Sequence, residues 1–195
     1  GGVSSVAGLV YLAVAVNLLN SVIGAVTLTS YLFIYTPLKS VTWLNTAIGA
    51  VPGALPPLMG WTAARGQITS EGWALFAILF FWQLPHFFAI AWLYKDEYAR
   101  AGFKMLPGID PNGQRTAQQA VSNTLALLAI SLFPFVFKMA GTVYLVSALV
   151  LGAGFLWCAI QFARQLTAAR ARQLFFASII YLPLLLALMV WDKLK

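Results

Sequence analysis

Long apolar stretches, separated by short polar interruptions, make up most of the chain. A membrane-crossing helix needs about 20 apolar residues, and fewer when it is tilted or partly buried. The stretches lack the short alternation of barrel strands, and lipid leaves irregular backbone unsatisfied. The pattern therefore predicts an all-α integral membrane bundle. Its candidate spans are residues 3–17, 20–36, 41–63, 71–94, 119–138, 142–163 and 173–191.

The third span, VTWLNTAIGAVPGALPPLMGWTA, differs from the others because it is crowded with helix-breaking residues. These residues are Gly49, Pro52, Gly53, Pro56, Pro57 and Gly60. We expect such a helix to kink or unwind, which is tolerated where protein or a cavity satisfies the freed backbone. A glycine-rich surface for close helix packing is an equally good interpretation. Both interpretations place the span inside the bundle.

One connection is long, running from Lys95 to about Gln118. It holds seven of the chain's seventeen charged residues, namely Lys95, Asp96, Glu97, Arg100, Lys104, Asp110 and Arg115. Long loops are usually functional or disordered. The mixture of apolar and turn residues in AGFKMLPGIDPNGQRT favours an ordered cap over a free linker.

Composition supports the membrane assignment, because 61% of the residues are hydrophobic and only 9% are charged. A soluble domain of this length needs far more charge to cover its surface. The net charge of +7 would suggest nucleic acid in a soluble protein. Here the basic residues fall between apolar spans, so orientation in the membrane explains them and no nucleic-acid partner is expected.

Alternation of the seven spans divides the basic residues unequally between the two membrane faces. One face collects Lys39, Lys95, Arg100, Lys104, Arg115, Arg164, Arg170 and Arg172. The other collects Arg65, Lys138, Lys193 and Lys195. The positive-inside rule therefore places the charged connection in the cytoplasm.

The stretch WQLPHF carries polar residues at membrane depth, including the chain's only histidine. Gln83 and His86 are three residues apart, so we expect them to share a helix face with Trp82 beside it. Pro85 removes a backbone hydrogen bond nearby. One interpretation is a core histidine satisfied by a neighbouring helix. The other is a histidine that binds a ligand or moves a proton.

The charged residues near the membrane surface also allow two interpretations. Asp96 and Glu97 offer oxygen ligands for a hard cation, and nearby Arg100, Lys104 and Arg115 suit phosphate groups. Together they would bind a metal–diphosphate whose lipid tail enters the bundle. The plainer alternative is a solvated loop. Likewise, Lys39 in YTPLK is an interface anchor or a site residue, and Asn45 is a candidate for lining a cavity.

Three stretches, YTPLK, NTAIGAVPGALPPLMGWTA and FWQLPHFFAIAWLYKDEYARAGFKMLP, occur in an order and spacing that resemble the protoheme IX farnesyltransferase (heme O synthase) branch of the UbiA-type membrane prenyltransferases. The resemblance covers about residues 3 to 195. It implies one transmembrane prenyltransferase domain with nine helices around a cavity, seven of them in this chain. The first two helices and a first acidic motif would be missing, so this chain alone is expected to be inactive.

The resemblance also assigns roles to individual residues. Asp96 takes the position of the leading acid in the second acidic motif, which holds Mg²⁺ and diphosphate, and Glu97 is a second candidate ligand. In related quinone-type enzymes an aspartate stands where this chain has Arg100. His86 and Asp96 are the expected catalytic residues. The expected substrate-binding residues are Gln83, Trp82, Tyr98, Lys95, Arg100, Lys104, Arg115, Asn45 and Lys39.

The implied reaction transfers a farnesyl group from farnesyl diphosphate to a vinyl group of protoheme IX, giving heme O and diphosphate. His86 would ligate the heme iron or transfer a proton. Heme is a substrate here, and Mg²⁺ is the expected cofactor. The expected location is the bacterial inner membrane, or the mitochondrial inner membrane in a eukaryote. The product would pass to a heme A synthase or to terminal-oxidase assembly.

Two other functions compete with this one. A related prenyltransferase acting on an aromatic or chlorin acceptor should carry an aspartate four residues after Asp96 and needs no histidine in WQLPHF; the chain meets neither expectation. A transporter should show a related pair of broken helices in two halves. The chain has one such segment, so heme farnesylation remains the preferred function.

Overall fold

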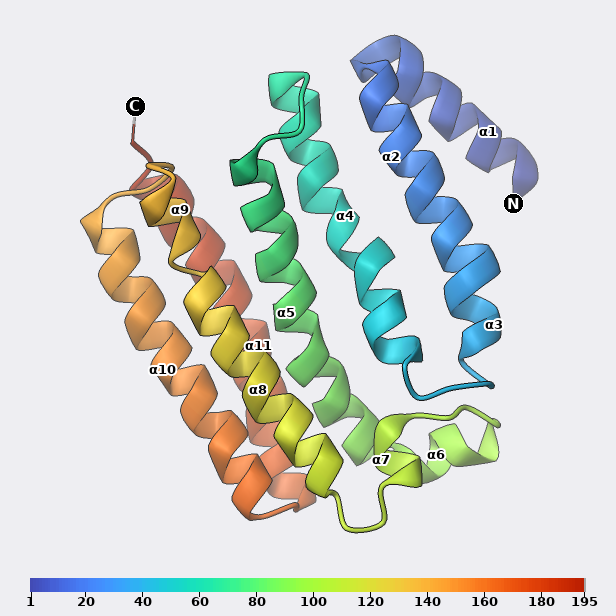
Figure 1. The fold of residues 1–195 in the computed structure, drawn as a ribbon, viewed down its shortest axis with the longest axis vertical. Helices are drawn as coiled ribbons and strands as arrows, with labels where there is room; N and C mark the ends of the chain where they lie inside the picture. Colours follow the sequence, from blue (N-terminus) through green and yellow to red (C-terminus); the bar gives the residue numbers. More distant parts are fainter. Residues whose placement is uncertain (195) are drawn as a thin grey trace.

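A computed structural model describes residues 1–194, and the regular elements within them are helices. In the labels used here and in Figure 1, η marks a π-helical segment. The first half of the chain contains α1 (Gly2–Tyr11), η1 (Leu12–Val16), α2 (Leu18–Thr29), η2 (Ser30–Tyr35), α3 (Thr36–Leu38), α4 (Asn45–Arg65) and α5 (Ser70–Leu93). The second half contains α6 (Lys95–Arg100), α7 (Leu106–Ile109), α8 (Gln114–Ile130), α9 (Phe133–Val136), α10 (Thr142–Arg164) and α11 (Ala168–Trp191).

Five helical stretches within residues 1–194 are long and apolar enough to cross a membrane. They are Leu18–Leu38, Ser70–Leu93, Gln114–Val136, Thr142–Arg164 and Ala168–Trp191. The other two predicted spans are also helical: Gly2–Val16 is shorter, and α4 is diluted by its glycines and prolines. The prediction of an all-α membrane bundle is therefore confirmed. The predicted start of the fifth span at residue 119 is wrong, because the polar first turns of α8 hide its beginning at Gln114.

The sequence predicts a kink or unwinding in the proline-rich helix α4; the helix is continuous from Asn45 to Arg65, so it does not unwind. Pro52, Pro56 and Pro57 all lie inside it, and their lost backbone bonds are tolerated because α2 and α5 pack against it. The helix ends at Gly66, whose φ of +72° is a left-handed conformation that favours glycine at a helix C-terminus. The apolar bundle thus carries a helix rich in small residues through its interior.

A closely packed core is formed by α5, α8, α10 and α11, which pack against one another in Figure 1. Its centre holds large side chains that are fully buried or nearly so, namely Tyr144, Phe155, Phe162 and Tyr181. The buried hydroxyls are paired: Ser131 and Tyr181 share a hydrogen bond of 2.7 Å, and Tyr144 donates to the Ser131 carbonyl at 2.8 Å. This well-satisfied core provides a rigid wall for the rest of the molecule.

On the other side of α5, helix α4 packs closely against it, and the packing becomes looser between α4 and α2. Helix α4 contacts α5 and α2, while α1 lies outermost and contributes no buried residue (Figure 1). Asparagines join α2 to α4: Asn17 donates to the Thr62 carbonyl, and Asn20 donates to the Met59 carbonyl, each at 2.9 Å. These bonds hold the two helices together at one end, which leaves room between them at the other.

The long connection between α5 and α8 is an ordered cap, as the sequence predicts. Helices α6 and α7 lie across one end of the bundle (Figure 1). The backbone N–H of Lys104 donates to the carbonyl of Lys39 at 2.8 Å, which ties the cap to α3. At its far end, Asp110 accepts hydrogen bonds from the backbone N–H and the hydroxyl of Thr116 at 2.8 and 2.9 Å, so it stabilises the start of α8.

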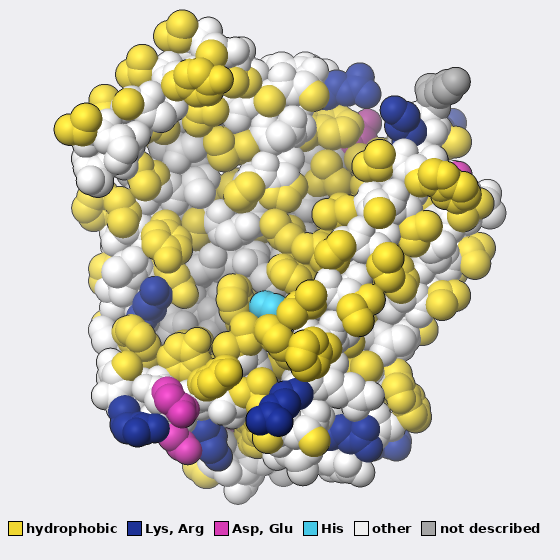
Figure 2. All heavy atoms as spheres, turned by 180° about the vertical axis from the view of Figure 1, so that it is seen from behind, with side chains coloured by type: hydrophobic (Ala, Val, Ile, Leu, Met, Phe, Trp, Pro, Cys, Tyr) yellow, Lys and Arg dark blue, Asp and Glu magenta, His cyan; other side chains and the backbone are white. Residues whose placement is uncertain are grey.

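The predicted alternation of the helices is also confirmed. The ends of α3 and α5, the cap and the α10–α11 connection all lie at the lower end of Figure 1, and the α4–α5 connection lies at the upper end. Figure 2 shows the molecule from behind. Most of the Lys and Arg side chains visible there lie at the lower end, together with two acidic side chains. Of the predicted basic residues, Lys195 lies outside the described residues.

Candidate active site

A cavity of about 750 Å³ opens between α2, α4, α5 and the cap. Its walls come from four parts of the chain, which are the stretch from α2 to Lys39, α4, α5 and the cap. The lining residues are Gly24, Thr27, Leu28, Tyr31, Tyr35, Lys39, Thr46, Gly49, Pro52, Gly53, Met59, Gln83, Phe87, Tyr98, Phe103 and Met105. Most of the lining is apolar, and its charged residue, Lys39, lies at the end that the cap covers.

One wall of the cavity follows a regular spacing in the sequence. Thr27, Tyr31, Tyr35 and Lys39 recur every four residues, which places their side chains along one helix face. Of these, only Lys39 is among the predicted site residues. The spacing was the signal that sequence reasoning missed, because tyrosines near a membrane surface are also common as interface anchors.

The Lys39 ammonium lies among aromatic rings at the cavity mouth. Its Nζ atom is 4.5 Å from the centre of the Tyr35 ring, 5.8 Å from that of Tyr31 and 6.0 Å from that of Phe103. Aromatic faces attract a cation and hold it in place, more strongly when water is excluded. Lys39 is therefore a positioned charge facing an apolar chamber.

Close approach of side chains to the glycines of α4 shapes the opposite wall. A Cβ atom on Gly49 would lie 2.5 Å from the Tyr35 ring, and one on Gly53 would collide with the Gln83 amide oxygen. Gln83 is buried and donates to the Ala50 carbonyl at 2.8 Å. The cavity-lining and close-packing interpretations of this helix are both correct, because the same glycines serve both purposes.

His86 faces a different helix. Its Nδ1 atom lies 2.7 Å from the Ser178 hydroxyl on α11, and its ring stacks between Trp82 and Phe175 with centroid distances of 4.9 and 5.0 Å. Trp82 also donates from Nε1 to the Ser178 carbonyl at 2.8 Å. Figure 2 shows the histidine at the floor of a hollow in the rear face, surrounded by hydrophobic side chains.

Gln83 and His86 lie about 60° apart around α5, as neighbours on one helix face do, and they reach different helices, because Gln83 bonds to α4 and His86 to α11. The expectation for Asn45 needs correction. Asn45 is fully buried but does not line the cavity. Its amide donates to the carbonyls of Thr42 and Lys104, so it holds the cap, and the next residue, Thr46, lines the cavity.

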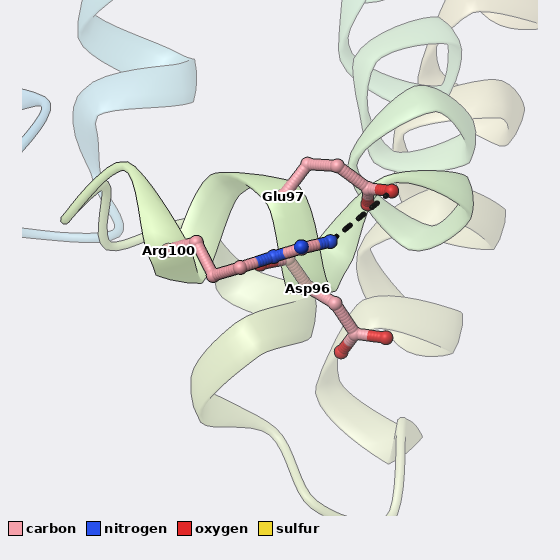
Figure 3. A network of polar contacts seen from close by, with 3 residues as sticks. All are labelled: Asp96, Glu97 and Arg100. Atoms are coloured by element: carbon pink, nitrogen blue, oxygen red, sulfur yellow. Dashed lines mark hydrogen bonds and ion pairs between the residues drawn. The ribbon is translucent and has the colours of Figure 1, made fainter.

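The acidic residues lie on α6, beside the cavity mouth. Figure 3 shows the Asp96 carboxylate pointing away from Glu97 and Arg100, which pair with each other. That ion pair has an N–O distance of 3.7 Å and is exposed, so it adds little stability. Tyr98, on the same helix, is turned into the cavity.

The other predicted basic residues do not line the cavity. Lys95 extends over the Trp92 ring, with Nζ 5.4 Å from its centre, and Arg100 pairs with Glu97. Lys104 and Arg115 are exposed, and Lys104 contributes its backbone to the cap. The structure therefore brings Lys39, Gln83 and Tyr98 together in one cavity and leaves the remaining predicted residues outside its lining.

Residues 1–194 contain no cluster of three or more His, Cys, Asp or Glu side chains placed to hold a metal ion. Mg²⁺, however, is commonly bound by one or two carboxylates together with substrate phosphates and water. The oxygens of Asp96 and Glu97 are donors of that kind, both exposed near the mouth. The donor set therefore fits part of a metal–diphosphate site.

Comparison with known proteins accounts for this arrangement. A profile of the UbiA prenyltransferase family matches residues 1–180. The chain belongs to the UbiA prenyltransferase family. Enzymes of this family generally use a divalent metal with a diphosphate substrate. The UbiA assignment agrees with a membrane bundle that carries carboxylates at the mouth of an apolar cavity.

Relatives of this UbiA chain are found in bacteria and in a plant. It is 52% identical to a protoheme IX farnesyltransferase of Solibacter usitatus over 97% of its own length and 65% of the relative's. It is 46% identical to one of Koribacter versatilis over 98% and 64%, and 36% identical to a mitochondrial one of Arabidopsis thaliana over 95% and 43%. No solved structure matches the chain. The chain thus spans at most about two thirds of these relatives.

Proposed function

We propose that the protein transfers a farnesyl group from farnesyl diphosphate to a vinyl group of protoheme IX, giving heme O. The observation that carries the proposal is the cavity, whose apolar walls end at the fixed Lys39 cation and the α6 carboxylates. An isoprenoid diphosphate has the complementary shape, with an apolar chain and an anionic end. The names of the relatives supply heme as the acceptor.

In this proposal the farnesyl chain enters the cavity and the diphosphate stays at the mouth. Gly49 and Gly53 let the Tyr35 ring and the Gln83 amide lie directly against α4, so these side chains form the wall along which the chain would lie. Lys39 and the Tyr98 hydroxyl face the diphosphate. Asp96, which points away from the Glu97–Arg100 pair, would hold Mg²⁺, with Glu97 as a second candidate ligand. When bound, Mg²⁺ neutralises charge on the leaving group.

The reaction begins when the bond between the allylic carbon and the diphosphate oxygen breaks, and the diphosphate leaves with the electron pair. Lys39 stabilises that developing negative charge because it is already in position. The rings of Tyr31, Phe87 and Phe103 face the cavity, where they can stabilise an allylic cation. A vinyl group of protoheme then bonds to this cation. Water adds to the new cation and loses a proton, which leaves a hydroxyethylfarnesyl group.

His86 lies on α5 next to the cavity-lining residues and bonds to α11, in the hollow of Figure 2. We place protoheme against this hollow, with His86 as an iron ligand or a proton acceptor. Gln83 and Phe87 belong to the cavity, and both lie within three residues of His86 on α5. Helix α5 therefore connects the two proposed substrate sites.

The chain covers less than two thirds of the length of these relatives, so the proposal concerns a protein of the relatives' full length. The relatives extend beyond the matched region, and a further acidic motif there would share the metal with Asp96. We also place the α6 end in the cytoplasm of a bacterial inner membrane, by the positive-inside rule. Transfer of the product to a heme A synthase or an oxidase assembly factor is part of the same proposal.

Product analysis tests the function. Membranes containing the full-length protein are incubated with protoheme, farnesyl diphosphate and Mg²⁺, and porphyrins are identified by mass. We expect heme O in the wild type and a loss of at least about 100-fold in Asp96→Asn, as for groups that stabilise leaving-group charge. Asp192→Asn is the matched control, because Asp192 caps α10 at the opposite end. Unmodified protoheme alongside a prenylated aromatic or chlorin acceptor would favour the competing function.

A further inference from the structure

Ser178 joins His86 to helix α11 through a hydroxyl that has two partners. The side chain is fully buried. Its Oγ atom lies 2.5 Å from the carbonyl oxygen of Phe175 and 2.7 Å from Nδ1 of His86. Trp82 donates to the carbonyl of the same serine, which holds α5 and α11 together at this level.

Counting hydrogen atoms determines which group donates each bond. The hydroxyl of Ser178 has one hydrogen, and the Phe175 carbonyl has none. At 2.5 Å, the two oxygens would repel each other unless the hydroxyl donates to the carbonyl. Once its hydrogen is used there, the Ser178 oxygen can only accept from the ring. Nδ1 of His86 must therefore carry a proton.

We propose that Ser178 is a positioning residue that fixes His86 in the neutral Nδ1–H form and leaves a free electron pair on Nε2. Rings on both sides, those of Trp82 and Phe175, keep the imidazole from turning over. Within residues 1–194, the structure shows no hydrogen bond to Nε2. This nitrogen is therefore available to a ligand in the apolar hollow of Figure 2.

An electron pair on Nε2 binds a metal ion or accepts a proton, whereas neutral His86 in this form has no proton to donate into the hollow. Histidines that ligate metals usually donate their other ring N–H to a fixed oxygen, and Ser178 supplies that oxygen. This step rests on the function proposed above. There, Nε2 is a ligand for the protoheme iron, and Ser178 tunes the affinity without touching heme.

The tautomer can be measured without any substrate. The ring nitrogens of ¹⁵N-histidine give different NMR shifts with and without a proton, and the signal that disappears in His86→Gln is assigned to His86. We expect a protonated Nδ1 and an unprotonated Nε2 in the wild type at a pH where the ring is neutral. Ser178→Thr, which keeps the hydroxyl, should preserve this form. Ser178→Ala should give a mixture of the two tautomers.

Two results would overturn the inference: a wild-type ring protonated at Nε2, or a spectrum of Ser178→Ala identical to that of the wild type. Ser122→Ala is the matched control, because Ser122 also donates to a carbonyl of its own helix, at 2.8 Å, but lies on α8 away from His86. It should leave the tautomer unchanged. Circular dichroism confirms that each variant keeps its helices.

A heme titration of the full-length protein then tests the consequence. Loss of an outer partner of a metal ligand typically weakens affinity about 10- to 100-fold, so we expect that loss in Ser178→Ala and near-normal affinity in Ser178→Thr. If NMR shows the predicted tautomer but the wild type does not bind heme, the proposed heme function is refuted and the positioning role of Ser178 stands. Heme binding with equal affinity in wild type and Ser178→Ala would refute the tuning by Ser178 but not the function.

Discussion

The indole N–H of Trp82 donates a 2.8 Å hydrogen bond to the carbonyl of Ser178, so a single contact between α5 and α11 supports one face of the His86 ring. The two residues are 96 positions apart in the chain. The contact joins two helices of the four-helix core, and one of them, α5, also borders the cavity. The contribution of this hydrogen bond to stability can be measured with Trp82→Phe, because phenylalanine keeps an aromatic face but has no N–H to donate.

Trp82→Phe should lower the free energy of unfolding by about 0.5–1.5 kcal/mol, the usual net value of one hydrogen bond. The α11 carbonyl can keep its own helical partner, so no orphaned acceptor adds to the loss. Thermal unfolding in detergent measures the change. Trp157→Phe on α10 is the control, since Trp157 is mostly exposed and should have little effect. Equal effects of the two changes would show that the Trp82 bond contributes no stability.

Lys39→Met should reduce kcat/KM for farnesyl diphosphate about 10- to 100-fold, since a hydrogen bond to a charged group is worth about 1.5–3 kcal/mol. Methionine keeps an apolar stem against the Tyr35 ring but removes the cation. Steady-state kinetics of the full-length protein measure the effect. Lys193→Met changes a lysine at the opposite end and should not alter the kinetics. An unchanged value in Lys39→Met would make Lys39 an interface anchor instead.

Gly53→Ala should destabilise the protein by about 1–3 kcal/mol, the usual cost of overpacking. The new methyl group collides with the Gln83 amide oxygen, so Gln83 must leave its bond to the Ala50 carbonyl. Gly60→Ala in the same helix has open space around its Cβ and should instead stabilise by about 0.5–1 kcal/mol. Thermal unfolding of the two variants gives the comparison. If Gly60→Ala is also destabilised, an added methyl group is unfavourable along the whole of α4 and not only at the cavity wall.

Asn45→Ala should loosen the cap while leaving the bundle folded. The buried amide donates to Thr42 at 2.6 Å and to Lys104 at 3.0 Å, and its loss should cost about 1–3 kcal/mol at that end. Hydrogen exchange should become faster in residues 95–113 and remain unchanged in α10. Asn45→Asp keeps the shape but has no N–H to donate, so it should behave like Asn45→Ala. If the aspartate variant protects the cap, shape and not the hydrogen bonds holds it.

Local patterns predicted the helices because lipid leaves the backbone few alternatives. Apolar runs marked all seven helical spans within residues 1–194, and glycine crowding identified α4 as an interior helix. Gln83 was recognisable as an inward-facing residue, since an unpaired amide is costly at membrane depth. Boundaries failed where polar turns continued an apolar helix, as at the start of α8.

Contacts between distant residues were beyond the reach of these patterns. The bond between His86 and Ser178 joins positions 92 apart, and one serine among many on apolar helices carries no signal of its own. Asn45 looked like a cavity residue because its partner, the Lys104 backbone, lies 59 positions away. By contrast, the separate directions of the Asp96 and Glu97 carboxylates follow from their order in the chain, because consecutive residues of a helix point about 100° apart (Figure 3).

Lys104 holds the cap through its backbone alone, because its N–H bonds to Lys39 and its carbonyl accepts from Asn45. Position 104 can therefore accept almost any amino acid over evolutionary time without loosening the cap. Proline is the exception, since it has no N–H to donate. The amide at position 45 has no such freedom. The hydrogen bonds that hold the cap therefore require the side chain of Asn45 but only the backbone of residue 104.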